Sequence, residues 1–216
     1  MARVKICGVT TVEDALMCVE EGAAAIGLNF VASSPRRVTE DEARAIVAAV
    51  GGRVLVVGVV ADLAVAETIA LRDRVRLGCL QLHGDEPPDA LAPLLPHAYK
   101  AIRVSGAEDV ARADAYGGEH VLVDAKRPGA LGGTGETFDW ALVAGLARRR
   151  KLTLAGGIRP ENVADAIHVV SPYCVDVASG AEIPGDPRKK DRARVRELVR
   201  VASRAGAGAS DRRRKR

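Results

Sequence analysis

Two side chains that can carry protons stand at the ends of short apolar runs. Cys7 closes the run at residues 4–7, and Asp124 closes the run at residues 121–124. A thiolate accepts a proton when its pKa is lowered, and a carboxyl group that ends an apolar strand must be paired, solvated in a cleft or shifted in its pKa. Both residues also have a structural interpretation, because free cysteines are usually buried and aspartates often cap turns. If both runs end at one mouth of a sheet, the two side chains could act as base and acid.

Two glycine-containing loops could hold a phosphate group. Gly156 and Gly157 follow one apolar run late in the chain, and Ser179 and Gly180 follow the next one. Glycine lets backbone N–H groups approach a ligand closely, and the loops after strands seven and eight of a (β/α)8 barrel often form a phosphate site. Two tight turns without a ligand are the alternative interpretation.

Two further side chains could contact a ligand at the same mouth. Arg36 lies in the loop after the run at 25–30, where its guanidinium could hold a carboxylate through two hydrogen bonds. His83 follows the run at 80–82 and could make a polar contact. A solvated surface arginine and a structural histidine are the alternatives. The glycine-rich segment 129–135 could move or let a backbone approach the ligand.

A scaffold that gathers the ends of many strands is needed to bring these candidates together. Short apolar runs, several of them β-branched, alternate with amphipathic segments, as is typical of a parallel sheet covered on both faces. The expected strands are 4–7, 25–30, 54–60, 80–82, 98–102, 121–124, 152–155 and 175–177, and the expected helices are 11–21, 39–50, 63–74, 89–95, 107–116, 139–150, 160–170 and 190–204. This order predicts an α/β protein with a closed (β/α)8 barrel. An open doubly wound sheet is the alternative, although no GxGxxG follows the first strand.

Three residues mark where these helices should begin. Thr11 and Thr39 have the side chains of N-caps, and acidic residues follow both of them. Pro160 stands where a proline of the first helical turn belongs.

Composition and charge are those of a globular protein with one domain. The chain has 216 residues, of which 48% are hydrophobic and 28% charged, and its 3% of aromatic residues offers few rings for stacking on bases. Its net charge is +4, but residues 204–216 hold six basic residues and one acidic residue, which leaves about −1 for the rest. We therefore predict one domain at 1–203, a basic disordered tail at 204–216, and no nucleic-acid partner.

The cysteines and the apolar runs indicate whether the chain binds a metal ion, which compartment it occupies and whether it crosses a membrane. Cys7, Cys18, Cys79 and Cys174 form no CxxC and no Cys/His pair at zinc spacing, so we expect no metal site and reduced thiols. The last three are expected to pack in the core. No apolar stretch approaches the about 20 residues that cross a membrane, and no hydrophobic leader precedes the first strand. The sequence thus predicts a cytoplasmic protein without a membrane partner.

Six motifs in a fixed order resemble one known family. They are KICG at 5–8, SPRRV at 34–38, QLHGDE at 81–86, FDW at 138–140, LAGGIRPENV at 154–163 and VDVASGAE at 175–182. Together they resemble phosphoribosylanthranilate isomerase from residue 3 to about residue 200. Three departures concern details. Ala178 stands where serine is common, and Val59 and Val60 end the third strand where an aromatic residue is common. The link at 184–191 is longer than usual, which we expect to loosen the start of the last helix.

The resemblance implies a TIM barrel of the ribulose-phosphate-binding type and a reaction of tryptophan biosynthesis. The implied reaction is the Amadori rearrangement of N-(5-phosphoribosyl)anthranilate, without cofactor or metal. By this resemblance Cys7 is the general base, Asp124 the general acid, and Arg36 the partner of the anthranilate carboxylate. The glycine loops with Ser179 would hold the phosphate group. The resemblance also implies a monomer, with a dimer as the alternative.

Two other functions remain as alternatives. The histidine-pathway isomerase is a related barrel that performs the same rearrangement, but it normally has an aspartate at the position of Cys7 and an internal two-fold repeat, and this sequence shows no such repeat. A non-catalytic phosphosugar-binding barrel would keep the glycine loops and lose the acid or the base. The presence of both Cys7 and Asp124 favours the enzyme.

Overall fold

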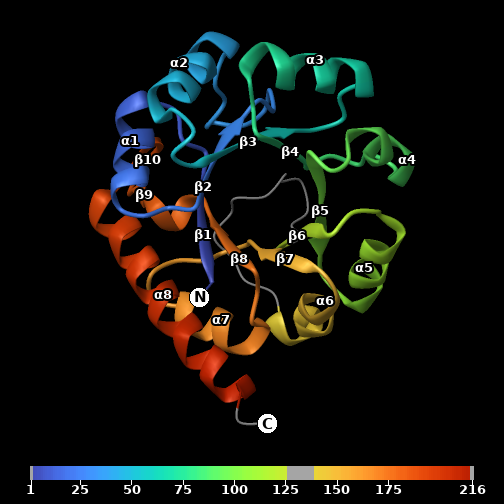
Figure 1. Cartoon of the computed structure of the whole chain (residues 1–216), viewed down its shortest axis with the longest axis vertical. Helices are drawn as coiled ribbons and strands as arrows, with labels where there is room; N and C mark the ends of the chain where they lie inside the picture. The colour runs from blue at the N-terminus through green and yellow to red at the C-terminus, as the bar shows by residue number, and fades with distance from the viewer. Residues whose placement is uncertain (1, 126–138, 215–216) are drawn as a thin grey trace.

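The backbone forms a closed barrel of eight parallel strands. The computed structural model describes residues 2–125 and 139–214, with residues 125 and 206–214 described by their backbone alone. The strands follow one another around the barrel in chain order from β1 to β8, and the helices surround them (Figure 1). The predicted (β/α)8 barrel is thereby confirmed. The glycine-rich segment 129–135 lies outside the described residues.

The pairing of the first strand shows that the sheet has no edge. The strands are β1 (Arg3–Cys7), β2 (Ala25–Asn29), β3 (Leu55–Val60), β4 (Cys79–Leu82), β5 (Ala98–Val104), β6 (His120–Ala125), β7 (Lys151–Leu154) and β8 (Cys174–Val177). Lys5 of β1 pairs with Ala25 of β2 on one side and with Asp176 of β8 on the other. An open doubly wound sheet would leave two unpaired edges, so that alternative is excluded.

Helices follow the strands, and two of them begin as the sequence predicted. They are α1 (Val12–Glu20), α2 (Glu40–Val50), α3 (Val65–Val75), α4 (Pro88–Leu91), α5 (Ala107–Arg112), α6 (Ala144–Arg149), α7 (Val163–Val170) and α8 (Arg192–Arg214), with 3-10 turns η1 (Ala92–Leu94), η2 (Ala113–Ala115), η3 (Trp140–Val143) and η4 (Ser179–Ala181). The Thr11 side chain accepts a hydrogen bond from the Asp14 N–H. Thr39 and Glu42 form a reciprocal capping box. Both predicted N-caps are confirmed.

The start of α7 differs from the prediction. Asn162, not Pro160, precedes the helix as its N-cap residue. The Asn162 side chain accepts a hydrogen bond from the Arg159 N–H at 2.9 Å and donates one to the Gly157 carbonyl at 2.9 Å. These bonds hold residues 157–162 as a turn, so the placement of Pro160 in the first helical turn is wrong.

The link before the last helix is an ordered hairpin, which corrects the expected loose start of that helix. Strand β9 (Glu182–Ile183) pairs antiparallel with β10 (Asp186–Lys190). The Lys190 N–H donates to the carboxylate of Asp14 in α1, and the Asp191 side chain accepts from two N–H groups at the start of α8. The extra residues of this link thus tie α8 to α1.

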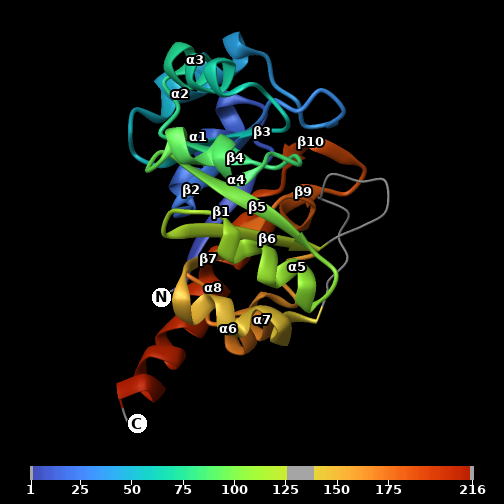
Figure 2. The ribbon, with the colours of Figure 1, turned by 90° about the vertical axis from the view of Figure 1, so that its right-hand side faces the viewer.

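The last helix runs further than the expected range 190–204. The backbone of residues 204–214 continues α8 up to Arg214. Alanine and arginine are strong helix formers, and the earlier turns of α8 supply the nucleus from which a helix extends. Figure 2 shows this end of α8 projecting away from the barrel. The limit of the barrel domain at residue 203 stays a prediction.

Apolar side chains pack on both sides of the barrel wall. The larger cluster fills the space between strands and helices and includes Ile6, whereas a smaller cluster around Leu122 and Tyr99 lies inside the barrel. Side chains of a strand alternate between its faces, so Lys5 and Cys7 point into the barrel when Ile6 points outward. The interior is therefore partly polar below its mouth.

Candidate active site

A cavity of about 410 Å³ opens at the carboxyl ends of the strands. The hairpin β9–β10 lies at this end, and the N-terminus lies at the other end of the barrel (Figure 2). The cavity is lined by seven of the eight residues proposed from the sequence, namely Cys7, Arg36, His83, Asp124, Gly156, Gly157 and Ser179. The barrel thus brings together residues that are up to 172 positions apart in the sequence. Gly180 is the residue that does not line the cavity.

The thiol of Cys7 ends β1 and is half-buried. Its sulfur has room because Gly27 of β2 lies opposite: a Cβ atom there would come within 2.8 Å of the Cys7 Sγ. Burial raises the pKa of this thiol, and the nearby Asp176 carboxylate raises it further. Lys5 and other cations lower it, without offsetting the two raising causes. In the ligand-free protein the thiol therefore holds its proton more tightly than an ordinary cysteine.

The carboxyl group of Asp124 ends β6 and is buried beside a histidine. Asp124 is 4% exposed, and its Oδ2 lies 3.4 Å from Nε2 of His83. Both side chains face the cavity that Cys7 lines. On the shorter way around the barrel β7 and β8 separate Asp124 from Cys7. The two groups therefore face the cavity from different strands, so that each could reach a different atom of a ligand.

The guanidinium of Arg36 is held by the hairpin. Its Nε and one terminal nitrogen donate to the two oxygens of Glu182 at 2.6 and 3.0 Å. Glu182 also accepts from the fully buried ammonium of Lys190 at 3.0 Å. Burial raises the pKa of Glu182, but the two cations outweigh it and hold that pKa below its usual range. Arg36 is therefore a fixed cation at the cavity wall and not a free surface arginine.

Gly8 explains how Arg36 reaches the cavity. Gly8 has a φ of +71°, and a Cβ atom there would lie 2.4 Å from Cδ of Arg36. A side chain at this position would displace the arginine, because no contact between carbon atoms is that short. The glycine that follows the thiol in KICG is thus required by the neighbouring loop.

The loops after β7 and β8 meet at the cavity. Gly156 and Gly157 have φ values of +88° and +67°, which favour glycine. In the part of the chain that the structure describes, their backbone N–H groups have no hydrogen-bond acceptor. Gly180 lies behind this site, where an added Cβ would come within 2.1 Å of the Ile158 carbonyl oxygen. Gly180 therefore lets the two loops pack backbone to backbone, and direct ligand contact by Gly180 stays a prediction.

The remaining cysteines are packing residues, as predicted. Cys18 and Cys174 are buried, and burial raises the pKa of each to about 12. Cys79 is half-buried inside the barrel and has a pKa raised to about 11. Within residues 2–125 and 139–214, no group of three His, Cys, Asp or Glu side chains is placed to hold a metal ion.

Comparison with known proteins identifies the family. The family model of N-(5'phosphoribosyl)anthranilate (PRA) isomerase matches residues 4–201. The chain belongs to this family. The N-(5'-phosphoribosyl)anthranilate isomerase of Geobacter metallireducens is 42% identical over 202 residues, which cover 94% of this chain and 99% of the relative. This chain is accordingly an isomerase of tryptophan biosynthesis.

Solved structures of PRA isomerases have the same fold. That from Thermotoga maritima matches with a TM-score of 0.85 and 38% identity, covering 94% of this chain and 99% of that one. A second PRA isomerase, solved in complex with reduced 1-(o-carboxyphenylamino)-1-deoxyribulose 5-phosphate, matches with a TM-score of 0.82 and 35% identity over 94% and 99% of the two chains. Among the described residues of this PRA isomerase, no helix is long and apolar enough to cross a membrane.

The sequence analysis missed a polar layer below the mouth of this isomerase. Lys5, Gln81 and Asp176 are buried inside the barrel, and Gln81 and Asp176 also line the cavity. The Lys5 ammonium donates to Gln81 at 2.8 Å and to Asp176 at 3.0 Å. Counting back two residues from Cys7 and His83 finds Lys5 and Gln81, because alternate residues of a strand share a face. For Asp176 the signal is a charge within the apolar run at 174–177.

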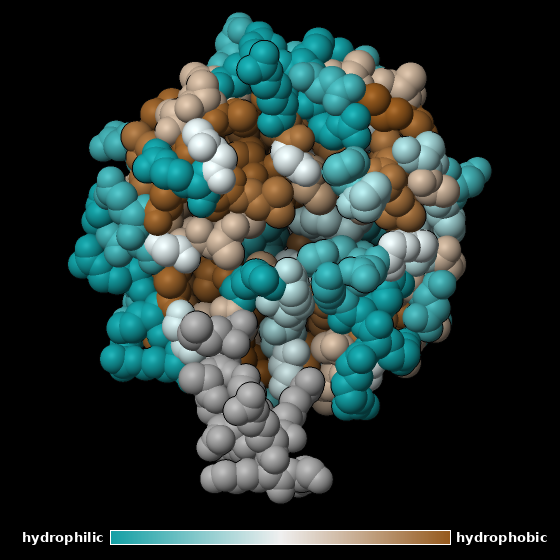
Figure 3. Space-filling model, in the orientation of Figure 1, coloured by the Kyte–Doolittle hydropathy of each residue, from teal (hydrophilic) through white to brown (hydrophobic). Residues whose placement is uncertain are grey.

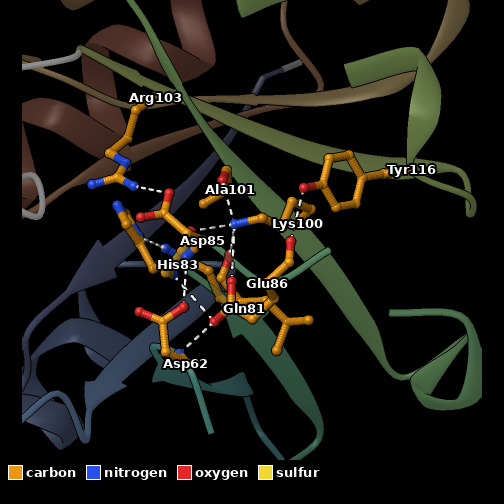
Figure 4. A network of polar contacts seen from close by, with 11 residues as sticks. Asp62, Gln81, His83, Asp85, Glu86, Lys100, Ala101, Arg103 and Tyr116 are labelled. Carbon is orange, nitrogen blue, oxygen red and sulfur yellow. Dashed lines mark hydrogen bonds and ion pairs between the residues drawn. The ribbon is translucent and has the colours of Figure 1, made fainter. Parts of the chain in front are cut away.

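The loop after β4 is held by a buried ion pair of this isomerase (Figure 4). The Lys100 ammonium lies 3.0 Å from Oε2 of Glu86 and donates to the carbonyl oxygens of Leu82 and Gly84 at 3.2 and 2.7 Å. Oε1 of Glu86 accepts from the Asp62 N–H at 2.8 Å. Burial lowers the pKa of Lys100, and Glu86 offsets only part of this effect. The two carbonyls that flank His83 are thus fixed from behind.

Proposed function

We propose that Cys7 and Asp124 are the base and the acid of the Amadori rearrangement by which this isomerase converts N-(5-phosphoribosyl)anthranilate to 1-(2-carboxyphenylamino)-1-deoxyribulose 5-phosphate. The observation that carries the proposal is that both side chains line one cavity, beside a loop whose Gly156 and Gly157 N–H groups have no acceptor among the described residues. A thiol and a carboxyl group on different strands can reach different atoms of one sugar.

The chemistry needs one proton donor and one proton acceptor. Asp124, protonated at the start, gives its proton to the ring oxygen, and the bond between this oxygen and the anomeric carbon breaks to give a Schiff base. The thiolate of Cys7 then removes the proton from the adjacent sugar carbon, and the resulting enolamine relaxes to the ketone. Each group is expected to contribute about 10²–10⁴-fold to the rate. The iminium nitrogen accepts the electron pair, so this route requires no metal or cofactor.

The charge of the intermediate explains how a thiol with a raised pKa can act as a base. Ring opening creates a cationic Schiff base next to the atom that loses its proton. A cation near a thiol favours the thiolate form. The base is therefore activated at the step that uses it, although burial and Asp176 raise the pKa of Cys7 in the ligand-free protein.

The two ends of the substrate are proposed to bind at opposite walls of the cavity. Arg36 holds the anthranilate carboxylate, while the phosphate group accepts hydrogen bonds from Gly156, Gly157 and Ser179. His83 contacts the sugar beside Asp124. Support comes from the relative that binds a reduced form of the product, an analogue with the same carboxylate and phosphate groups. Fixing both ends orients the sugar between base and acid.

Steady-state turnover of three variants tests these roles. Cys7→Ala and Asp124→Asn should each lose nearly all of kcat while binding of a phosphate-bearing product analogue is retained, because each removes a proton carrier and no binding group. Cys79→Ala is the control, since Cys79 is a second interior thiol that does not line the cavity. A wild-type rate in either test variant would show that its role is assigned wrongly.

We also propose that the isomerase acts as a monomer in the cytoplasm, with a homodimer as the alternative. The described residues of one chain already bring the proposed acid, base and phosphate loop to one cavity. All four cysteines are free, which suits a reducing compartment. Light scattering after size-exclusion chromatography tests the first point: a mass near 22.7 kDa supports the monomer, and twice that mass contradicts it.

A further inference from the structure

Two hydrogen-bond donors converge on one atom of Gln81. The Lys5 ammonium lies 2.8 Å from Oε1 of Gln81, and the Tyr99 hydroxyl lies 3.0 Å from the same atom. Although burial lowers the pKa of Lys5, the Asp176 carboxylate together with Cys7 and Tyr99 outweighs it, and this pKa is held well above its usual range. An ammonium group has no lone pair, so the amide atom that faces Lys5 must be the oxygen. The orientation of the Gln81 amide is thereby fixed.

A fixed amide fixes the histidine next to it. With its oxygen facing Lys5 and Tyr99, Gln81 presents its NH2 group to Nδ1 of His83 at 2.7 Å. Nδ1 must accept this hydrogen bond, and in a neutral imidazole the proton then resides on Nε2. The chain of contacts from Lys5 through Gln81 to His83 thus selects one of the two tautomers.

The selected tautomer places a donor beside the proposed acid. Nε2 of His83 is buried, lies 3.4 Å from Oδ2 of Asp124, and has no hydrogen-bond partner within the residues that the structure describes. A buried donor without a partner is unfavourable by about 1–3 kcal/mol, so it is available to a carboxylate or a ligand that arrives. Asp124 becomes a carboxylate when it has given up its proton, and the Nε2–H group can then stabilise it.

We infer that Gln81 is a positioning residue of the reaction: it holds His83 in the Nε2–H tautomer, so that a hydrogen-bond donor and not an acceptor faces Asp124. This inference rests on the proposed role of Asp124 as the acid. In the other tautomer the Nε2 lone pair would accept the proton of the Asp124 carboxyl group. The proton needed by the ring oxygen would then be held by the histidine.

The backbone around His83 is fixed independently of its ring. The Lys100 ammonium holds the carbonyl oxygens of the residues on either side of His83 (Figure 4). These hydrogen bonds from Lys100 oppose a movement of the loop that would turn the imidazole. Gln81 determines which ring nitrogen of His83 carries the proton. A change at Gln81 should alter the tautomer and leave the position of the loop intact.

Nitrogen NMR of the full-length protein tests the inference directly. A protonated and an unprotonated imidazole nitrogen have well-separated ¹⁵N shifts, and the chain has four histidines, so His83 can be assigned by comparison with His83→Ala. At pH 8, wild-type His83 should carry its proton on Nε2. In Gln81→Glu the new carboxylate accepts from Nδ1, so the proton should appear on Nδ1. A wild-type proton on Nδ1 would overturn the inference.

Kinetics show whether Gln81 acts through His83. Gln81→Met removes the amide without adding charge, and kcat should fall about 10- to 100-fold, a part of what acid catalysis supplies. The affinity for the phosphate-bearing product analogue should change less than about 3-fold, since no binding group is lost. In a His83→Ala background the same substitution should change kcat less than about 2-fold, as expected for residues that act as a unit. An equal loss of kcat in both backgrounds would contradict the inference.

A control variant tests whether any change inside the barrel has the same effects, and the NMR measurement tests the tautomer independently of the role proposed for Asp124. Cys79→Ala changes the interior residue two positions before Gln81 on the same strand, and it should leave both the His83 tautomer and kcat unchanged. The tautomer is measured without turnover, so its assignment does not depend on Asp124. If Asp124→Asn kept a wild-type rate, the proposed acid would be wrong while the tautomer measurement still decided the role of Gln81.

Discussion

The pKa of the Cys7 thiol depends on two charged residues of the polar layer below the mouth of the barrel. Asp176 raises the pKa of Cys7, and Lys5 lowers it. Asp176 and Lys5 form an ion pair with each other at 3.0 Å. Because burial already disfavours the thiolate, the net effect in the ligand-free protein is a raised pKa. Asp176 also has one buried oxygen without a partner in the described part of the chain. Burial and this carboxylate together keep the thiol protonated until a ligand brings positive charge.

Asp176→Asn should lower the pKa of Cys7. The substitution removes the negative charge that disfavours the thiolate and leaves the Lys5 cation unpaired, so both effects act in the same direction. The measurement is the pH dependence of iodoacetamide alkylation of the Cys7 peptide, followed by mass spectrometry. The alkylation curve should move to lower pH. Asp165→Asn, an exposed change on α7, serves as the control. An unmoved curve in Asp176→Asn would contradict this account.

At the scale of elements, the hairpin β9–β10 holds the arginine that we propose to bind the substrate carboxylate. Glu182 of this hairpin holds Arg36, and Lys190 supports Glu182 from behind. The hairpin is also tied to α1 through Asp14. A segment between the last strand and the last helix therefore sets the position of an arginine that lies 146 residues earlier in the chain.

Glu182→Gln should raise KM more than it lowers kcat. Glutamine keeps the shape and loses the charge, so Arg36 is less firmly held and Lys190 keeps no anionic partner among the residues described. We expect the free energy of unfolding to fall by about 1–3 kcal/mol, as for a buried polar group that loses its partner. Steady-state kinetics and urea unfolding measure the two effects. Glu119→Gln, in an exposed ion pair with Lys151, should change neither. An unchanged KM would show that Arg36 does not need the hairpin.

Gly180→Ala should separate the two proposed phosphate loops. The added Cβ would lie 2.1 Å from the Ile158 carbonyl oxygen and 2.9 Å from Cα of Arg159, and backbone cannot yield as a flexible side chain would. We expect a loss of about 1–3 kcal/mol in the free energy of unfolding, as for other overpacked sites, together with weaker binding of the product analogue. The matched control is Gly106→Ala, where an added Cβ meets nothing within 4 Å. Equal stabilities of the two variants would contradict the prediction.

At the scale of the whole molecule, the cavity and the end of the chain lie at opposite ends of the barrel. Helix α8 begins next to the hairpin, runs back along the barrel and projects beyond the ends where the strands begin (Figure 2). Figure 3 shows the face of the barrel at which the strands begin. Hydrophilic side chains occupy most of its rim, and hydrophobic side chains lie further in. The six basic residues and one acidic residue of the segment 204–216 account for the positive net charge of the chain.

Removal of residues 206–216 should leave kcat and KM unchanged. The described residues that line the cavity lie elsewhere in the chain, and the segment follows the part of α8 that packs on the barrel. The assay should be repeated at low and at physiological ionic strength, because a distant charge on an anionic substrate acts over about 10 Å and is weakened by salt. A rise in KM that appears only at low salt would assign the basic end a role in attracting the substrate.

The sequence located the strands and the mouth residues but not the residues between them. All eight strands of the barrel followed from local periodicity, because a strand and its end are defined by neighbouring residues. That Cys7 and Asp124 share one mouth followed only on the condition that the sheet closes, which periodicity does not show. Pro160 was misplaced since the side chain of Asn162 decides the turn through bonds that no periodicity records. Gln81 was missed because a glutamine in a strand is notable only when its partners are known.

What the sequence alone determined was the fold class, the family motifs and the residue types that can move a proton. These depend on spacing along one strand or loop, where covalent geometry dictates which side chains share a face. The tertiary structure decided how those residues are charged and oriented. The raised pKa of Cys7, the clamp on Arg36 and the tautomer of His83 each arise from groups on other strands or on the hairpin. Such effects depend on distances across the barrel, which exist only after it has closed.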